Sequence, residues 1–152
     1  MNSVDQPELE ALRQQNIGRL FQRAARGYSE LALEKLRALG RYDGLTLFHT
    51  ALISNLDVEG TRISLLAERA GVSKQAMGQV VDELEKDGLI LRMPDPSDKR
   101  ATLIKFTEKG WQFLQDAYHV KLEIEASYAA ILGEEQFAML KSLLETLVMH
   151  QK

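Results

Sequence analysis

Two glutamines stand four residues apart in the segment SKQAMGQVVDELEK, which begins at Ser73. In a helix, residues with this spacing lie one above the other, so Gln75 and Gln79 would project from the same face. A glutamine amide donates and accepts hydrogen bonds at the same time, which matches the edge of an adenine base. Lys74 beside them suits a phosphate group. A solvated polar face is the alternative. The candidate DNA contacts in this segment are Ser73, Lys74, Gln75, Gly78 and Gln79.

A second group of polar residues, Asp98-Lys99-Arg100, ends the proline-containing stretch MPDPSDKR. An arginine at the exposed end of a hairpin can enter a narrow minor groove, where the electrostatic potential is most negative. The carboxylate of Asp98 could hold that guanidinium through a bidentate pair. Residues 91–110 carry five basic and three acidic side chains, a local charge of +2, whereas the whole chain carries −3. Asp98, Lys99 and Arg100 are therefore also candidate DNA contacts.

The residues before the glutamines fit two helices joined by a tight turn. EGTRI favours a break and a short strand ahead of them. Ala67 is small where the two helices would cross, and Gly71 tolerates the positive φ that the turn requires. The expected helices run over 65–70, capped by Ser64, and over 74–86, capped by Ser73.

An apolar stripe on these two helices is expected to face the protein interior. Asp82, on the polar side, is interpreted as a solvated carboxylate, because phosphates would repel it. The remaining acids of VDELEKDG are interpreted in the same way, as part of a solvated helix face. Any hairpin of two helices in a bundle could show a similar pattern. The predicted buried stripe consists of Leu66, Ala70, Val72, Met77, Val80, Val81 and Leu84.

The hydrophobic period changes after Gly88, a glycine of the kind that ends helices. LILRM (89–93) and ATLIKFT (101–107) favour two strands, and PDPSDKR between them favours a turn-rich connection. Thr107 can cap a further helix. A strand hairpin directly behind the second helix is typical of a winged helix-turn-helix, and a plain helical hairpin would not need it.

A set of short stretches across residues 66–110 forms one combined pattern: Leu66-Ala67, Gly71-Val72-Ser73, Val81-Asp82-Glu83-Leu84-Glu85, Gly88-Leu89-Ile90, Arg92, Asp95-Pro96-Ser97-Asp98-Lys99-Arg100, Leu103-Ile104 and Phe106-Thr107-Glu108-Lys109-Gly110. With this pattern the chain resembles the winged helix-turn-helix of MarR-family transcriptional regulators, and the order of the flanking helices agrees over nearly the whole chain. Gly78-Gln79 departs from the family, because many relatives carry serine or threonine and then arginine there. The departure suggests a different operator or weaker direct readout.

The resemblance implies a homodimer whose terminal helices interlock and whose winged domains contact adjacent major grooves of a pseudo-palindromic operator. It also implies that Asp98 braces Arg100 for the minor groove. Members commonly repress transcription and release DNA when a small phenolic or anionic compound binds between the dimer helices and the DNA-binding domain. We therefore expect a repressor released by such an effector, although the residues themselves are equally compatible with an activator. The absence of cysteine excludes the redox-sensing branch.

Long amphipathic stretches flank the winged region. Apolar residues recur at three- and four-residue steps from Leu9 towards Gly40 and predict one helix of roughly thirty residues. A short helix is expected from Thr46 to about Asn55, a long one after Thr107, and a last one from Glu134 to about Gln151. These stripes exceed what a small domain can cover, which favours a symmetric dimer. The predicted fold is mainly α with a small β wing, one intertwined unit made of an N-terminal dimerisation helix (1–40), a winged helix-turn-helix domain (41–110) and C-terminal dimerisation helices (111–152).

Composition argues against several classes of protein. The chain has no cysteine, and His49, His119 and His150 lie far apart in the sequence, so neither a disulfide nor a metal site is expected. No phosphate-binding glycine loop, nucleophile elbow or zinc-protease motif occurs, so we expect neither an enzyme nor a cofactor. No apolar run is long enough to span a membrane, and the first fifteen or so residues lack the layout of a secretion signal. A cytoplasmic protein is therefore expected.

An effector pocket is expected where the long N-terminal helix, the second helix and the winged domain meet. Tyr28, His49 and Arg92 could line it, and an arginine there would suit a carboxylate or a phenolate. A core aromatic and a surface arginine are the alternative. A different class of function also stays open, namely a winged-helix module that binds protein and not DNA, which the net charge of −3 and Gly78-Gln79 would suit.

Overall fold

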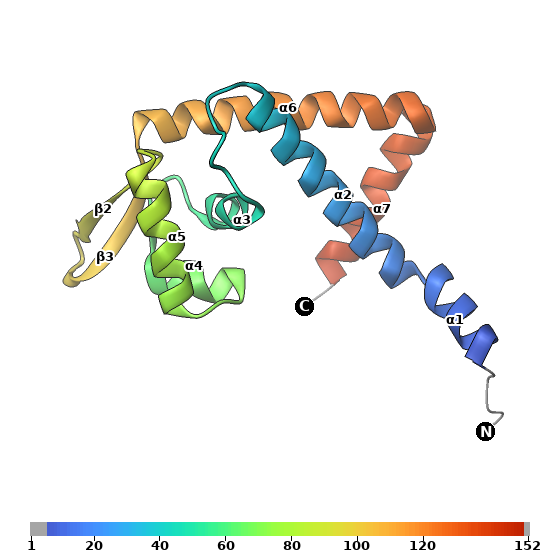
Figure 1. Cartoon of the computed structure of the whole chain (residues 1–152), viewed down its shortest axis with the longest axis horizontal. Helices are drawn as coiled ribbons and strands as arrows, with labels where there is room; N and C mark the ends of the chain where they lie inside the picture. Colours follow the sequence, from blue (N-terminus) through green and yellow to red (C-terminus); the bar gives the residue numbers. More distant parts are fainter. Residues whose placement is uncertain (1–5, 151–152) are drawn as a thin grey trace.

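The computed structural model describes residues 6–150. It is arranged along one long helix, α6 (Glu108–Leu132), with a winged domain at one end and α7 (Glu134–His150) folding back from the other (Figure 1). Helix α2 (Ile17–Ala38) packs against α6 and continues α1 (Gln6–Gln15), which extends away from the winged domain. The fold is therefore mainly α with a small β wing, as predicted. The remaining elements are α3 (Leu47–Asn55), β1 (Thr61–Arg62), α4 (Ile63–Ala70), α5 (Lys74–Lys86), β2 (Ile90–Asp95) and β3 (Asp98–Phe106).

The N-terminal segment contains two helices, so the single helix predicted from the apolar period is wrong. Asn16, between α1 and α2, has an extended backbone with φ −70° and ψ 147°. Its side-chain oxygen accepts a hydrogen bond from the backbone N–H of Arg19 at 2.9 Å, and its amide donates to the carbonyl of Arg13 at 2.7 Å. One asparagine side chain thus closes the first helix and caps the second, which an unbroken helix would not permit.

Local capping signals place the next helices as predicted. Thr46 caps α3 and accepts from the backbone N–H of His49 at 3.3 Å. Gly71 turns the chain between α4 and α5 with φ 66°, a conformation that favours glycine. Ser73 then caps α5 by accepting from the backbone N–H of Ala76 at 3.1 Å. The helix-turn-helix is present, with α5 in the position of its second helix.

The predicted cap of the first of these helices, Ser64, is wrong. Helix α4 begins at Ile63, and Arg62 occupies its N-cap position without a side-chain hydrogen bond. The difference follows from β1, in which Arg62 pairs with Leu103 of β3 and keeps the chain extended up to that residue. The start of α4 is thus set by pairing with a strand some forty residues away, which the local sequence does not show.

The strands of the wing form an antiparallel sheet in the order β1-β3-β2. Strands β2 and β3 extend into the stretch predicted as a connection, so that Pro94 pairs with Thr102 and only Pro96-Ser97 remain as the turn. A proline is tolerated there because β2 lies at the edge of the sheet. Arg100 therefore lies in β3, close to the tip of the wing, and not in a loop.

A close backbone approach fixes the winged domain to the start of α6. Thr107 caps α6 as predicted, accepting from the backbone N–H of Gly110 at 3.0 Å. Gly110 is buried, and a Cβ atom there would lie 2.1 Å from the carbonyl oxygen of Leu89. Only glycine permits this contact, so the start of α6 meets the backbone of Leu89, between α5 and β2, without a side chain between them. The largest fully buried side chains are Leu52, Leu66, Met77, Val81, Leu84, Ile90, Ile104 and Ile124.

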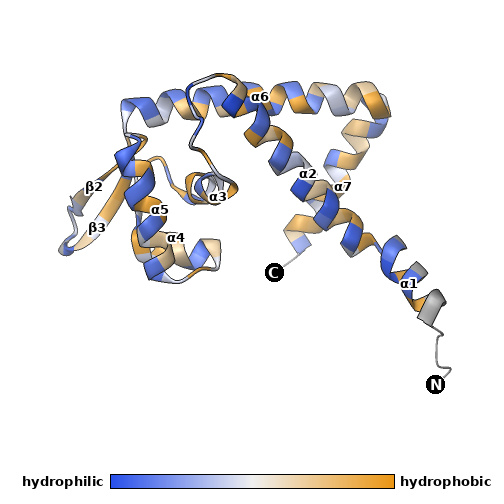
Figure 2. Ribbon diagram, in the orientation of Figure 1, coloured by the Kyte–Doolittle hydropathy of each residue, from blue (hydrophilic) through white to orange (hydrophobic). Residues whose placement is uncertain are grey.

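The long helices keep many apolar side chains at the surface. Figure 2 shows apolar residues distributed along α2 and α7, away from the winged domain. No residue of α7 is buried, and Leu144 and Leu147 are 38% and 48% exposed. The excess of apolar surface expected from the sequence is therefore present. Within residues 6–150, no helix is both long enough and apolar enough to cross a membrane.

Candidate DNA-binding surface

Helix α5 has one buried and one exposed side, as predicted. Its apolar residues, including Met77 and Val81, face the core. Gly78 is half-buried on the polar side, and the first turn of α5 contains no acidic residue. The positive end of the helix dipole is therefore not neutralised by a carboxylate in that turn. The predicted contacts that lie exposed on this side are Ser73, Lys74, Gln75 and Gln79.

Gly78 is not required by the packing of α5. A Cβ atom at this position would meet nothing within 4 Å, and the residue does not have a positive φ. Glycine inside a helix costs roughly 0.5–1 kcal/mol relative to alanine. The glycine thus lowers the stability of α5 without a steric reason, and its effect is to leave the helix surface without a side chain beside Gln75 and Gln79.

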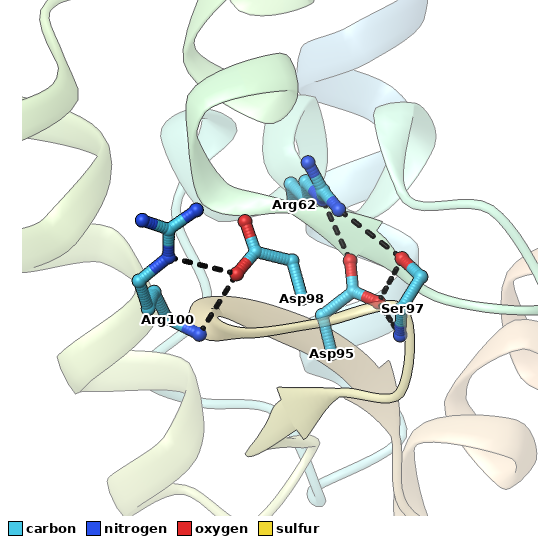
Figure 3. A network of polar contacts seen from close by, with 5 residues as sticks. All are labelled: Arg62, Asp95, Ser97, Asp98 and Arg100. Carbon is cyan, nitrogen blue, oxygen red and sulfur yellow. Dashed lines mark hydrogen bonds and ion pairs between the residues drawn. The ribbon is translucent and has the colours of Figure 1, made fainter.

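Arg100 projects from the wing with 93% of its side chain exposed. Figure 3 shows its Nε pointing to Asp98, and the distance to the Oδ1 atom is 3.3 Å. The same oxygen accepts from the backbone N–H of Arg100 at 3.1 Å. The predicted bidentate pair is therefore wrong, because a single carboxylate oxygen of Asp98 accepts both hydrogen bonds from Arg100. Among the described residues, the terminal guanidinium nitrogens of Arg100 make no hydrogen bond. The side chain of Lys99 lies outside the described part of the structure.

Arg92 joins the wing to α5 through two carboxylates. Its Nη2 donates to Asp82 at 2.5 Å, its Nη1 donates to Glu85, and its backbone N–H donates to Glu85 at 2.9 Å. The carbonyl oxygen of Gly78 lies 3.5 Å from Nη2. Strand β2 and the exposed side of α5 are thereby held as one unit.

Asp82 is exposed, as predicted, but it also pairs with Arg92, as does the half-buried Glu85. Burial by itself would lower the pKa of Arg92, but the hydrogen bonds to Asp82 and Glu85 raise it above its usual value. The arginine is therefore always charged and compensates carboxylates that would otherwise repel phosphates. The sequence shows these acids and Arg92, but it does not show that they pair, because Arg92 reaches α5 only when the β2-β3 hairpin is folded.

His49, in α3, makes a second contact with α5. It is buried, with 3% of the residue exposed. Its Nδ1 accepts from the backbone N–H of Thr46 at 3.2 Å, so Nε2 carries the proton and donates to Glu83 at 2.7 Å. His49 thus links α3 to α5, a contact that the sequence did not predict.

The three predicted effector residues do not line one cavity, since neither His49 nor Arg92 is among the residues around the cavities that Tyr28 lines. Tyr28 does line a cavity, of about 150 Å³, which lies between α2, α3 and α6. Its walls are mostly apolar, with a lysine and four hydroxyl side chains among them. The residues around it are Tyr28, Ser29, Ala32, Leu36, Thr50, Ile53, Ser54, Phe113, Leu114, Ala117, Val120 and Lys121.

Comparison with known proteins identifies the same region. Residues 51–102 match the model of the MarR family. The uncharacterized HTH-type transcriptional regulator YkoM of Bacillus subtilis is 28% identical over 134 residues, which cover 85% of this chain and 82% of that protein. The HTH-type transcriptional regulator MhqR of the same organism is 32% identical over 73 residues, covering 48% of this chain and 50% of MhqR.

The fold agrees with a solved structure of the family. The ligand-free form of MarR from E. coli superimposes with a TM-score of 0.73 at 24% identity, covering 87% of this chain and 96% of MarR. The named relatives are transcriptional regulators, which favours DNA binding over a module that binds only protein. Residues 51–102 therefore form a winged helix-turn-helix that matches the MarR family, and the chain is a DNA-binding transcriptional regulator similar to members of that family.

Proposed function

We propose that the protein binds a pseudo-palindromic operator as a homodimer, with α5 in the major groove and the wing in the adjacent minor groove. The observation that carries this proposal is the Arg92 contact, which fixes the exposed polar side of α5 and the exposed Arg100 relative to each other. Because α5 and the wing would not move independently, one surface would contact both grooves, with the distance between α5 and the wing fixed.

The residues on this surface have different roles. Gln75 and Gln79 would bond base edges, where a bidentate contact discriminates against a wrong base by roughly 1–3 kcal/mol. Gly78 between them would let the backbone approach the groove. Arg100 would enter the minor groove, where Asp98 restricts its direction. The remaining contacts, to phosphates, would come from Ser73, Lys74 and Lys99.

The apolar surface of the long helices supports a dimer. An open apolar space of about 480 Å³ lies between α2, α6 and α7, and Phe21, Phe137, Leu140 and Leu144 are among its lining residues. Burying one large apolar side chain contributes roughly 1.5–3 kcal/mol. Helices of a second copy would cover this surface, and the two α5 helices would then meet half-sites about 34–36 Å apart.

The cavity between α2, α3 and α6 suits the effector that would release DNA. At about 150 Å³ it has the volume of a single aromatic ring. Apolar walls would hold the ring, and Lys121 with the hydroxyls of Ser29 and Thr50 would meet a carboxylate or phenolate. A ligand that displaces α3 would also displace α5, because His49 bonds Glu83, and would change the spacing of the two recognition helices. The protein would then act as a repressor relieved by a small aromatic acid.

DNA fragments selected from the source genome by the purified protein provide the test. On a selected fragment, Gln75→Ala and Gln79→Ala should each weaken binding about ten-fold or more, since each removes a base contact. Gln112→Ala, an exposed glutamine on α6, serves as the control and should bind as the parent protein does. Equal affinity of all three variants would overturn the placement of α5 in the major groove.

A further inference from the structure

Arg62 connects the tip of the wing to the start of α4. Figure 3 shows its guanidinium beside Asp95 and Ser97. Its Nε donates to the Oδ2 atom of Asp95 at 2.6 Å, and its Nη2 donates to the hydroxyl of Ser97 at 3.3 Å. Arg62 ends β1, so it approaches the turn from outside the β2-β3 hairpin.

Asp95 is the centre of this network. Its second oxygen, Oδ1, accepts from the backbone N–H of Ser97 at 2.7 Å and from the Ser97 hydroxyl at 2.6 Å. Asp95 is 6% exposed, so its carboxylate is almost withdrawn from solvent and satisfied by these partners. The two residues of the turn, Pro96-Ser97, therefore have a fixed conformation.

The fixed turn determines the direction in which the following residues leave it. Asp98 comes directly after Ser97 and pairs across the hairpin with Asp95, and Arg100 bonds back to Asp98. A hairpin held only at its base can bend along its length. The wing is held near its middle by Arg92 and at its tip by Arg62, from two different sides.

We propose that Arg62 is a positioning residue for DNA binding, which holds the wing tip through Asp95 and Ser97 so that Arg100 is presented to the minor groove in one direction. This inference rests on the proposed contact of Arg100 with DNA. An arginine is required, because its planar fork bonds a carboxylate and a hydroxyl at once, whereas a lysine offers a single point charge. The Arg62 side chain is 44% exposed, and ion pairs at such sites add little to the stability of a fold.

The test compares Arg62→Ala with Arg69→Ala. Arg69 is the matched control, because it also lies at α4 and pairs with a carboxylate, Asp57, at 2.9 Å, but away from the wing. Operator affinity is measured by fluorescence anisotropy over a series of salt concentrations, together with the melting temperature. We expect Arg62→Ala to weaken binding about ten-fold, as the loss of one arginine contact would. Arg69→Ala should bind normally, and the melting temperatures of the two variants should be similar.

A double variant separates positioning from direct contact. If Arg62 acts through Arg100, the double variant Arg62→Ala/Arg100→Ala binds no more weakly than Arg100→Ala alone. The slope of log affinity against log salt concentration then becomes shallower by about 0.9 in the double variant and in Arg100→Ala alike. If Arg62 contacts a phosphate itself, the two losses add and the slope falls by about 1.8 in the double variant, which overturns the proposal. Asp95→Asn keeps the size of the side chain but removes its charge and one of the two acceptor oxygens that Arg62 and Ser97 use, so it should reproduce Arg62→Ala.

The remaining outcomes distinguish this inference from the proposed function. Normal binding by Arg62→Ala, together with weak binding by Arg100→Ala, would overturn the positioning role and leave the wing contact in place. Normal binding by both variants would overturn the wing contact and the positioning role with it. Should Arg62→Ala fail to fold, Arg62→Lys and Asp95→Asn decide the question, and normal binding by both would refute the proposal.

Discussion

Replacing Gly78 by alanine should make the protein more stable and a weaker DNA binder. The added Cβ atom would meet nothing within 4 Å, and the backbone does not need a positive φ. Alanine inside a helix is more favourable than glycine by roughly 0.5–1 kcal/mol. For a chain of 152 residues, a gain of about 1 kcal/mol corresponds to a rise in melting temperature of roughly 2–4 °C.

The same methyl group should interfere with DNA. It would stand beside Gln75 and Gln79 on the same side of α5 and hold the helix back from the groove. Hydrogen bonds are limited to donor–acceptor distances of about 2.7–3.2 Å, so a small displacement is enough to break a base contact. Losing one such contact corresponds to a decrease in affinity of about ten-fold.

Gly27→Ala provides the control for both measurements. Gly27 lies inside α2, and a Cβ atom there would also meet nothing within 4 Å. We expect it to gain similar stability in urea unfolding and to keep full operator affinity in fluorescence anisotropy. A less stable Gly78→Ala would refute the account of packing around α5. A more stable variant that binds as tightly as the parent would refute the close approach of Gly78 to DNA.

Three further predictions concern other parts of the molecule. Gly110→Ala should lower the free energy of unfolding by about 1–3 kcal/mol, because its Cβ would overlap the carbonyl oxygen of Leu89, and an unchanged urea midpoint would contradict this contact. The hydrogen bonds from Ser97, and then that from Arg62, lower the pKa of Asp95 from 3.8 to about 2. Their contribution is complete above about pH 5 and is lost progressively as the pH falls to about 2 and below, so the melting temperature of the parent protein should drop more over this interval than that of Asp95→Asn. Equal drops would count against the network. Leu144→Glu places a charge on the exposed apolar side of α7 and should give a monomer in analytical ultracentrifugation, whereas an intact dimer would exclude this face from the interface.

The helix ends that the sequence predicted correctly depend on residues at the ends themselves. Thr46, Ser73 and Thr107 each accept a hydrogen bond from a backbone N–H three residues on, and Gly71 adopts a positive φ. These preferences arise within one turn of the chain, so they can be predicted without the fold. Asn16 carries the same kind of signal, but the apolar period around it extends through the break and indicated one helix.

The contacts that define the candidate surface join residues that are distant in sequence. Arg62 meets Asp95 across 33 positions, and His49 meets Glu83 across 34. Composition and local spacing do not identify such partners, because they depend on how β1, α3 and the wing are placed around α5. The sequence therefore predicted which polar residues would be exposed, but not which arginines hold them in place.

Together, α5 and the wing are expected to read duplex DNA. The most direct test measures the affinity for a selected operator and for a random duplex of equal length over a range of salt concentrations. The account predicts that the operator binds at least about 10³-fold more tightly at physiological salt. It also predicts that affinity falls steeply as salt rises, by about 0.9 in the log–log slope for each phosphate neutralised. Equal affinity for both duplexes, or an affinity that does not change with salt, would contradict it.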